Sequence, residues 1–158
     1  MNVPSRTRAA PRLYTPEERA RRDASPWTMV QGILAPLQFA VFAMSLALVL
    51  RFLATGDGYA VATASVVLKT GVLLLIMVTG SIWEKAVFDR WLLAPAFFWE
   101  DVVSFGVIAL HLAYVAMLWS SAFSAQAEMV CALAAYAAYL INAGQFLRKL
   151  RLARLDAA

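Results

Sequence analysis

The sequence predicts an all-α integral membrane protein, a four-helix bundle with its N- and C-termini in the cytoplasm. The 158-residue chain is 62% apolar and has a mean hydropathy of +0.67. A soluble domain is roughly 45–50% apolar. Four mostly apolar stretches are each long enough to cross the roughly 30 Å hydrocarbon core of a bilayer. The composition and these stretches predict the class and the number of spans.

The distribution of basic residues predicts the orientation of the bundle. Six arginines precede the first span, Lys85 and Arg90 lie between the second and third, and four basic residues follow the fourth. The opposite side carries only Arg51. Because basic residues concentrate in cytoplasmic loops, both termini and the middle connection are expected in the cytoplasm. The charges indicate topology and contact with anionic lipid, and we expect no binding to nucleic acid.

The elements follow in order along the chain. Residues 1–14 are basic and rich in Ala and Pro, and are expected to form a disordered tail. Thr15, Pro16 and Glu18 form a capping-box pattern, which predicts a short surface helix over 15–24. A single transmembrane domain then covers 25–150, and a basic tail covers 151–158. The predicted transmembrane helices are about 27–52, 61–83, 98–120 and 127–149.

The connections between the spans differ in character. Gly56-Asp57-Gly58 predicts a tight turn into the second span. The connection from Glu84 to Asp101 contains WLLAPAFFW. Its tryptophans favour the membrane interface over water, because Trp concentrates at headgroup depth.

Polar residues at membrane depth are candidates for function because they are costly there. The stretch PAFFWEDVVS (95–104) opens the third span with Glu100 and Asp101. At about 100° per residue, Glu100, Ser104 and His111 share one helix face, which should look into the bundle. Asp101 points some 100° away. The other candidates near the cytoplasmic side are Gln31, Gln38, Glu84, Lys85, Asn142 and Gln145.

The carboxylates also have structural interpretations. Glu100 and Asp101 could cap the third span, since carboxylates favour a helix N-terminus. Glu84 and Lys85 could form an ion pair at the interface.

The remaining polar groups could be structural as well. His111, Asn142 and the glutamines could hydrogen-bond between helices. Lys69 lies within the second span. We expect it to snorkel to the far interface, or to pair with Asp57 or Glu128.

Several kinds of site are excluded by the residues available. A single histidine cannot build a bis-His haem site within one chain, and Cys131 alone forms no intrachain disulfide. No cluster has zinc or di-iron spacing. The first span lacks the carboxylate expected of a small proton-coupled exporter. We therefore expect no resident metal and no cofactor.

Five segments together resemble the 3-vinyl bacteriochlorophyllide hydratase family, over about residues 13–152. They are DASPWTMVQGILAPLQF (23–39), TASVVLKTGVL (63–73), MVTGSIWEKAVF (77–88), APAFFWEDVVS (94–104) and AAYLINAGQFLRKL (137–150). The resemblance implies a hydro-lyase of bacteriochlorophyll biosynthesis in the inner membrane of phototrophic bacteria, cytoplasmic or photosynthetic. It would add water across the C3-vinyl group of chlorophyllide a or a related bacteriochlorophyllide, giving a 3-(1-hydroxyethyl) side chain.

The implied chemistry needs an acid and a placed water, and no redox cofactor. Hydration begins when an acid protonates the terminal vinyl carbon. Water then attacks the inner carbon, where the cation is delocalised into the macrocycle. A carboxyl group in an apolar environment can keep its proton near neutral pH, so Glu100 or Glu84 is expected to be the acid. Asp101 or His111 is expected to orient or deprotonate the water.

Other residues suit a flat pigment. Phe97, Phe98 and Trp99 offer faces for the ring, and Lys85 or Arg90 could meet its propionate. His111 could instead be an axial ligand of the substrate's magnesium. The predicted substrate-binding set is completed by Asn142 and Gln145.

Two other function classes stay open at this point. A non-catalytic pigment carrier or assembly protein would use the aromatics and His111 without needing Glu84 or Glu100. A small transporter would leave the pigment unchanged. The expected partners are the pigment and the lipid bilayer, with a homo-oligomer or a complex with other biosynthetic enzymes also allowed.

Overall fold

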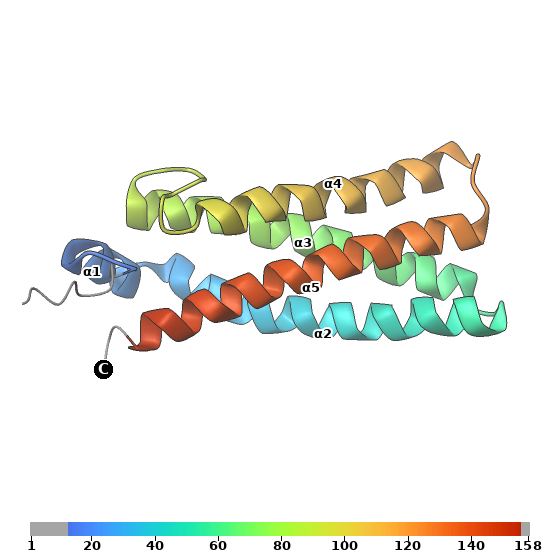
Figure 1. The fold of residues 1–158 in the computed structure, drawn as a ribbon, viewed down its shortest axis with the longest axis horizontal. Helices are drawn as coiled ribbons and strands as arrows, with labels where there is room; N and C mark the ends of the chain where they lie inside the picture. Colours follow the sequence, from blue (N-terminus) through green and yellow to red (C-terminus); the bar gives the residue numbers. More distant parts are fainter. Residues whose placement is uncertain (1–12, 156–158) are drawn as a thin grey trace, which may run out of the picture.

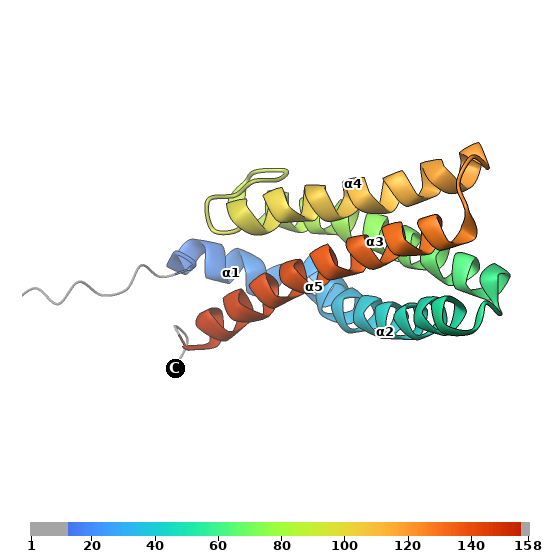
Figure 2. The same cartoon turned by 45° about the vertical axis from the view of Figure 1, so that its right-hand side comes forward.

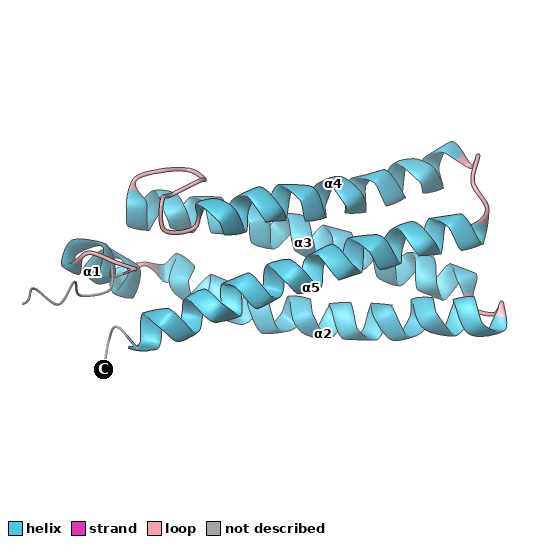
Figure 3. Cartoon of the chain, viewed as in Figure 1, coloured by secondary structure: helices cyan, strands magenta, loops and turns pink. Residues whose placement is uncertain are grey.

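The computed structural model describes residues 13–155, which form five α-helices and no strand (Figures 1 and 3). A short helix precedes four long ones, each long and apolar enough to cross a membrane. The all-helical class and the four candidate spans are confirmed. The helices are α1 (Pro16–Ala24), α2 (Pro26–Thr55), α3 (Tyr59–Phe88), α4 (Phe98–Ser120) and α5 (Ala125–Leu155).

Helix α1 begins with the predicted capping box. Thr15 Oγ1 accepts a hydrogen bond from the Glu18 amide at 3.2 Å, and the Glu18 carboxylate accepts one from the Thr15 amide at 2.8 Å. The expected disordered tail lies outside the described residues up to residue 12. Tyr14, which the sequence assigns to that tail, is instead buried, and its ring stacks on Phe88 at 5.7 Å between centroids. The aromatic contact fixes the chain just before α1.

The predicted turn between α2 and α3 is present, and glycine is required there. Gly56 and Gly58 have φ of 79° and 87°, in the left-handed region that side chains with a Cβ rarely adopt. The Gly56 amide closes α2 by bonding to the Phe52 carbonyl at 2.8 Å. The turn is therefore tight enough to bring α3 back alongside α2.

The four long helices form an antiparallel bundle. Helix α2 packs mainly against α3, and α4 against α5, while α5 also contacts α2 (Figure 2). The core contains polar contacts as well as apolar side chains, since Ser45 hydrogen-bonds to Ser65 at 2.7 Å and also to Tyr136. Such bonds join helices where no water competes for them.

One end of the bundle gathers α1, the connection 89–97 between α3 and α4, and the end of α5 (Figure 1). The turns between α2 and α3 and between α4 and α5 lie at the other end. Helix α5 continues to Leu155, through most of the stretch that the sequence assigns to a tail. Because the first end carries most of the basic residues, we propose that it faces the cytoplasm.

Thiol labelling tests this orientation. In a Cys131→Ala background, Ala122→Cys should react with a membrane-impermeant maleimide in intact spheroplasts, because it lies in the exposed turn between α4 and α5. Arg90→Cys, exposed at the other end, should react only in inverted vesicles. The reverse pattern would contradict the proposed orientation.

Candidate active site

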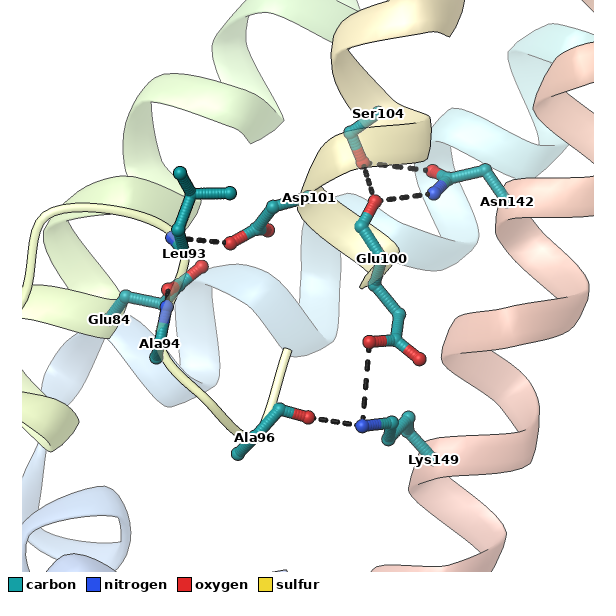
Figure 4. A network of polar contacts seen from close by, with 9 residues as sticks. All are labelled: Glu84, Leu93, Ala94, Ala96, Glu100, Asp101, Ser104, Asn142 and Lys149. Carbon is teal, nitrogen blue, oxygen red and sulfur yellow. Dashed lines mark hydrogen bonds and ion pairs between the residues drawn. The ribbon is translucent and has the colours of Figure 1, made fainter. Parts of the chain in front are cut away.

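Two carboxyl groups are buried together at the end of the bundle that holds the 89–97 connection. Glu84 lies near the end of α3 and Asp101 in the first turn of α4, and each side chain is only 4% exposed. Figure 4 shows them on the same side of α4, beside the connection. Burying a carboxyl group is costly unless hydrogen bonds replace its water.

The connection supplies those hydrogen bonds from two consecutive amides. The Leu93 amide donates to Asp101 Oδ2 at 2.7 Å, and the Ala94 amide donates to Glu84 Oε2 at 3.0 Å. Leu93 has a φ of 59°, which costs a non-glycine residue of order 1 kcal/mol or more. A left-handed residue lets successive amides converge on acidic groups, so the carboxyl pair accounts for the strain.

Glu84 and Asp101 lie next to each other beside the connection (Figure 4). Two ionised carboxylates this close would repel each other, and a proton on one of them removes that repulsion. A buried pair of this kind is suited to holding one proton between its two groups. This is the arrangement of a carboxyl dyad, in which close like charges keep one group neutral.

Glu100 points to a different side of α4 from Asp101 (Figure 4). Its carboxylate forms an ion pair with Lys149 of α5, with Nζ and Oε2 3.4 Å apart. Lys149 also donates a hydrogen bond to the Ala96 carbonyl of the connection. The ammonium therefore ties α5 both to α4 and to the connection.

Further hydrogen bonds between α4 and α5 involve a backbone carbonyl and the side-chain amide of Asn142. The Glu100 carbonyl accepts from Ser104 Oγ at 2.8 Å and from Asn142 Nδ2 at 2.9 Å. Glu100, Ser104 and His111 are all buried, which confirms that this face of α4 looks into the bundle. Asn142 is an interhelical contact in the structure, as one of its two sequence interpretations expects.

The alternative ion pair of Lys85 with Glu84 is wrong. Lys85 instead pairs with Asp89 one turn further on, with Nζ and Oδ1 2.6 Å apart. This hydrogen bond, together with the charge of the ammonium, lowers the pKa of the exposed Asp89 carboxyl. The other predicted partner for a propionate, Arg90, is exposed beside it.

The three aromatics before Glu100 have different surroundings. Phe97 is buried, and its ring lies against Tyr14, Trp83 and other aromatic rings. Phe98 and Trp99 are 41% and 68% exposed. Only these two present a free ring surface outside the bundle.

A pocket of about 440 Å³ lies where α4 begins and α5 ends. Trp99, Glu100 and Gln145, which the sequence singles out, are brought together there. The full lining is Trp99, Glu100, Gln145, Arg148, Lys149 and Leu152. In the sequence, Arg148 and Lys149 indicate only the topology. Their position after the fourth span does not predict that α5 places them beside the start of α4.

His111 lies deeper, fully buried between helices. Its Nδ1 is 2.8 Å from the Val107 carbonyl, which accepts the ring proton. Its Nε2 has no hydrogen-bond partner among residues 13–155. Because a carbonyl can only accept, Nδ1 carries a proton. The hydrogen-bond partner of His111 is a carbonyl of its own helix, and the structure does not bring the histidine together with Glu84 and Asp101.

The expectation for Lys69 is wrong. Its side chain is fully buried instead of reaching the far interface, and Nζ lies 3.8 Å from the centroid of the Tyr139 ring. Within the described residues Nζ has no hydrogen-bond partner. Glu128 bonds to Tyr59 instead. The Tyr139 face offers a cation–π contact inside the bundle, which a single sequence cannot reveal.

Comparison with known proteins identifies close relatives. The model of a family described as 2-vinyl bacteriochlorophyllide hydratase matches residues 14–152. A protein of that name from Cereibacter sphaeroides is 69% identical over 153 residues, 94% of this chain and 93% of the relative. Another from Rhodobacter capsulatus is 66% identical over 149 residues, 92% of this chain and 85% of the relative. No solved structure matches the chain.

Replacing Lys69 tests whether the burial of its ammonium lowers the stability of the protein. Lys69→Met keeps the length of the side chain and removes a buried ammonium that no described carboxylate neutralises, so it should stabilise the protein by roughly 1–4 kcal/mol. The matched variant Lys149→Met should destabilise it, because it leaves Glu100 without its cation. Thermal unfolding in detergent measures both. A loss of stability in Lys69→Met would show that the Tyr139 contact outweighs desolvation.

Proposed function

The chain belongs to the 2-vinyl bacteriochlorophyllide hydratase family, and we propose that Glu84 and Asp101 form the acid–base pair of its hydration reaction. The protein is a hydro-lyase of bacteriochlorophyll biosynthesis that adds water across the vinyl group of a bacteriochlorophyllide-type pigment. The position numbered 2 in the relatives' names corresponds to C3 in the current numbering of the macrocycle. The reaction gives a 1-hydroxyethyl side chain there.

The observation that carries the catalytic assignment is the burial of two neighbouring carboxyl groups, each of which accepts a hydrogen bond from the connection. Hydration needs a group that gives a proton and another that takes one back. Glu84 and Asp101 suit both tasks, because two close, buried carboxyl groups favour a state in which one keeps its proton and the other is ionised. Glu100, the other acid expected from the sequence, is instead paired with Lys149 at 3.4 Å. Its carboxylate is engaged by an ammonium and lies outside the pair.

In the first step, the protonated carboxyl of Glu84 gives its proton to the terminal vinyl carbon. The two π electrons form the new C–H bond, and the inner carbon becomes a cation delocalised into the macrocycle. The negative charge left on the pair stabilises that cation, since it is fixed where positive charge develops.

In the second step, a water oxygen bonds to the inner carbon and its extra proton passes to Asp101. A proton then passes from Asp101 to the neighbouring Glu84. The pair returns to its starting state, as a reaction with no net release of protons requires. The consecutive amides of Leu93 and Ala94 hold both groups in place through the cycle.

Access to the pair involves the connection that covers it. Both carboxyl groups are buried under residues 89–97, so the vinyl group reaches them when this connection shifts. Phe98 and Trp99, exposed on the first turn of α4, offer ring faces to the incoming macrocycle. Gln145 lies with Trp99 in the pocket at the end of α5.

His111 is a candidate for a different task. Its Nδ1 proton is held by a backbone carbonyl, which is how a histidine that ligates a metal is usually oriented. Its Nε2 would therefore suit the magnesium of the substrate as an axial ligand. The ring is fully buried, so this contact would require the bundle to open beside α4.

The proposed location follows from the spans and the charges. The four long helices make the chain a multi-pass membrane protein. We place it in the bacterial inner membrane with the carboxyl pair at the cytoplasmic end. A homo-oligomer or a complex with other enzymes of the pathway is compatible with the apolar outer surface.

A labelling assay tests the reaction and its acid together. Membranes that contain the chain, incubated with the vinyl pigment in oxygen-18 water, should give a product heavier by one labelled water. Glu84→Gln should lower turnover by roughly 10²–10⁴-fold, the usual contribution of general acid–base catalysis. Pigment separation and mass spectrometry measure the product.

Glu100→Gln is the matched control, because it changes a neighbouring buried carboxylate outside the pair. It should keep far more activity than Glu84→Gln. If Glu100→Gln loses turnover while Glu84→Gln retains it, the acid is Glu100. If bound pigment stays unlabelled with the unaltered chain, the protein is a carrier.

Asp101→Asn tests the return of the proton. The amide cannot take a proton from water, yet it can still accept the hydrogen bond from Leu93. Turnover should fall by a factor similar to that of Glu84→Gln, and the double variant should lose little more, because the two groups act as one unit. Independent, multiplying losses in steady-state turnover would argue against a shared function.

A further inference from the structure

The pocket between α4 and α5 contains a cation that the hydration chemistry does not use. Its volume of about 440 Å³ is within the range of small-molecule sites. Arg148 and Lys149 both line it, but their surroundings differ. Lys149 is engaged by Glu100 and the Ala96 carbonyl. Arg148 is exposed and forms no ion pair with any residue in 13–155.

The charges around Arg148 leave a net positive site. Glu100 is the only carboxylate in the lining, and Lys149 balances it. A guanidinium can hold a carboxylate through two parallel hydrogen bonds. The pocket is therefore suited to a ligand that carries one carboxylate.

The opposite wall suits a flat apolar body. Trp99 lines the same pocket and is 68% exposed, so most of its indole is free for stacking. A phospholipid headgroup would supply an anion for Arg148 but no flat ring for Trp99. A macrocycle with a carboxylate side chain supplies both.

We propose that Arg148 binds the propionate carboxylate of the pigment while Trp99 lies against its macrocycle. This rests on the proposed function, because a bacteriochlorophyllide-type pigment carries a free propionate. The vinyl group and the propionate lie on different pyrrole rings. Asp101 and Glu100 point to different sides of α4 (Figure 4), so the proposal places the macrocycle beside the start of α4 with its vinyl and propionate edges toward different sides of the helix. Arg148 takes the role that the sequence suggested for Lys85 or Arg90.

The experiment compares the free-acid pigment with its methyl ester. For the unaltered chain, the ester should have a higher KM and a similar kcat. Arg148→Gln should raise KM for the acid by roughly 10- to 100-fold, the value of a hydrogen bond to a charged group, and leave the ester unchanged. Arg151→Gln, which removes an exposed arginine of α5 outside the pocket lining, is the control and should change neither.

Equilibrium binding, followed by pigment absorbance, separates this inference from the proposed function. Preferential binding of the acid that Arg148→Gln abolishes supports the site even if no pigment is hydrated. Equal binding of acid and ester by the unaltered chain overturns it. An equal loss for acid and ester in Arg148→Gln also overturns it, and would assign Arg148 to lipid contact or to folding.

Discussion

Two buried carboxyl groups bind two consecutive backbone amides, and the end of the bundle that holds the 89–97 connection is organised around these bonds. Glu84 and Asp101 accept from Ala94 and Leu93 at 3.0 and 2.7 Å. Without these donors, two carboxyl groups would be buried without compensation for lost hydration. The connection between α3 and α4 must therefore keep its conformation, including the left-handed backbone at Leu93. The need to satisfy these groups fixes a segment that has no helix of its own.

The burial of Glu84 and Asp101 bears both on the stability of the fold and on the proposed reaction. Burial of Glu84 and Asp101 costs hydration, and in the proposed mechanism the same burial keeps a proton on one of the two groups for transfer to the vinyl carbon. Lys149 completes the assembly from the other side of α4, because it contacts both Glu100 and the Ala96 carbonyl. The connection is therefore held both by the carboxyl pair and by Lys149.

Much of the fold could be predicted because it depends on local and periodic signals. The length of the apolar stretches predicts the four spans, and the glycines predict the turn at 56–58. The helical spacing of Glu100 and His111 predicts the buried face of α4. The partners of the carboxyl groups could not be predicted, since they are backbone amides of an irregular connection. The role of Lys149 depends on the packing of α4 against α5. The burial of Lys69 over Tyr139 depends on tertiary contacts in the same way.

Infrared spectroscopy of the resting protein would test the shared proton most directly. A protonated carboxylic acid has a carbonyl stretch that a carboxylate lacks, and isotope exchange in heavy water shifts it. If Glu84 and Asp101 share a proton, the protein should show one such band near neutral pH. The band should disappear in Glu84→Gln and survive in Glu100→Gln. A spectrum without a protonated carboxyl band, or a band lost only in Glu100→Gln, would contradict the assignment of Glu84 and Asp101 as the acid–base pair.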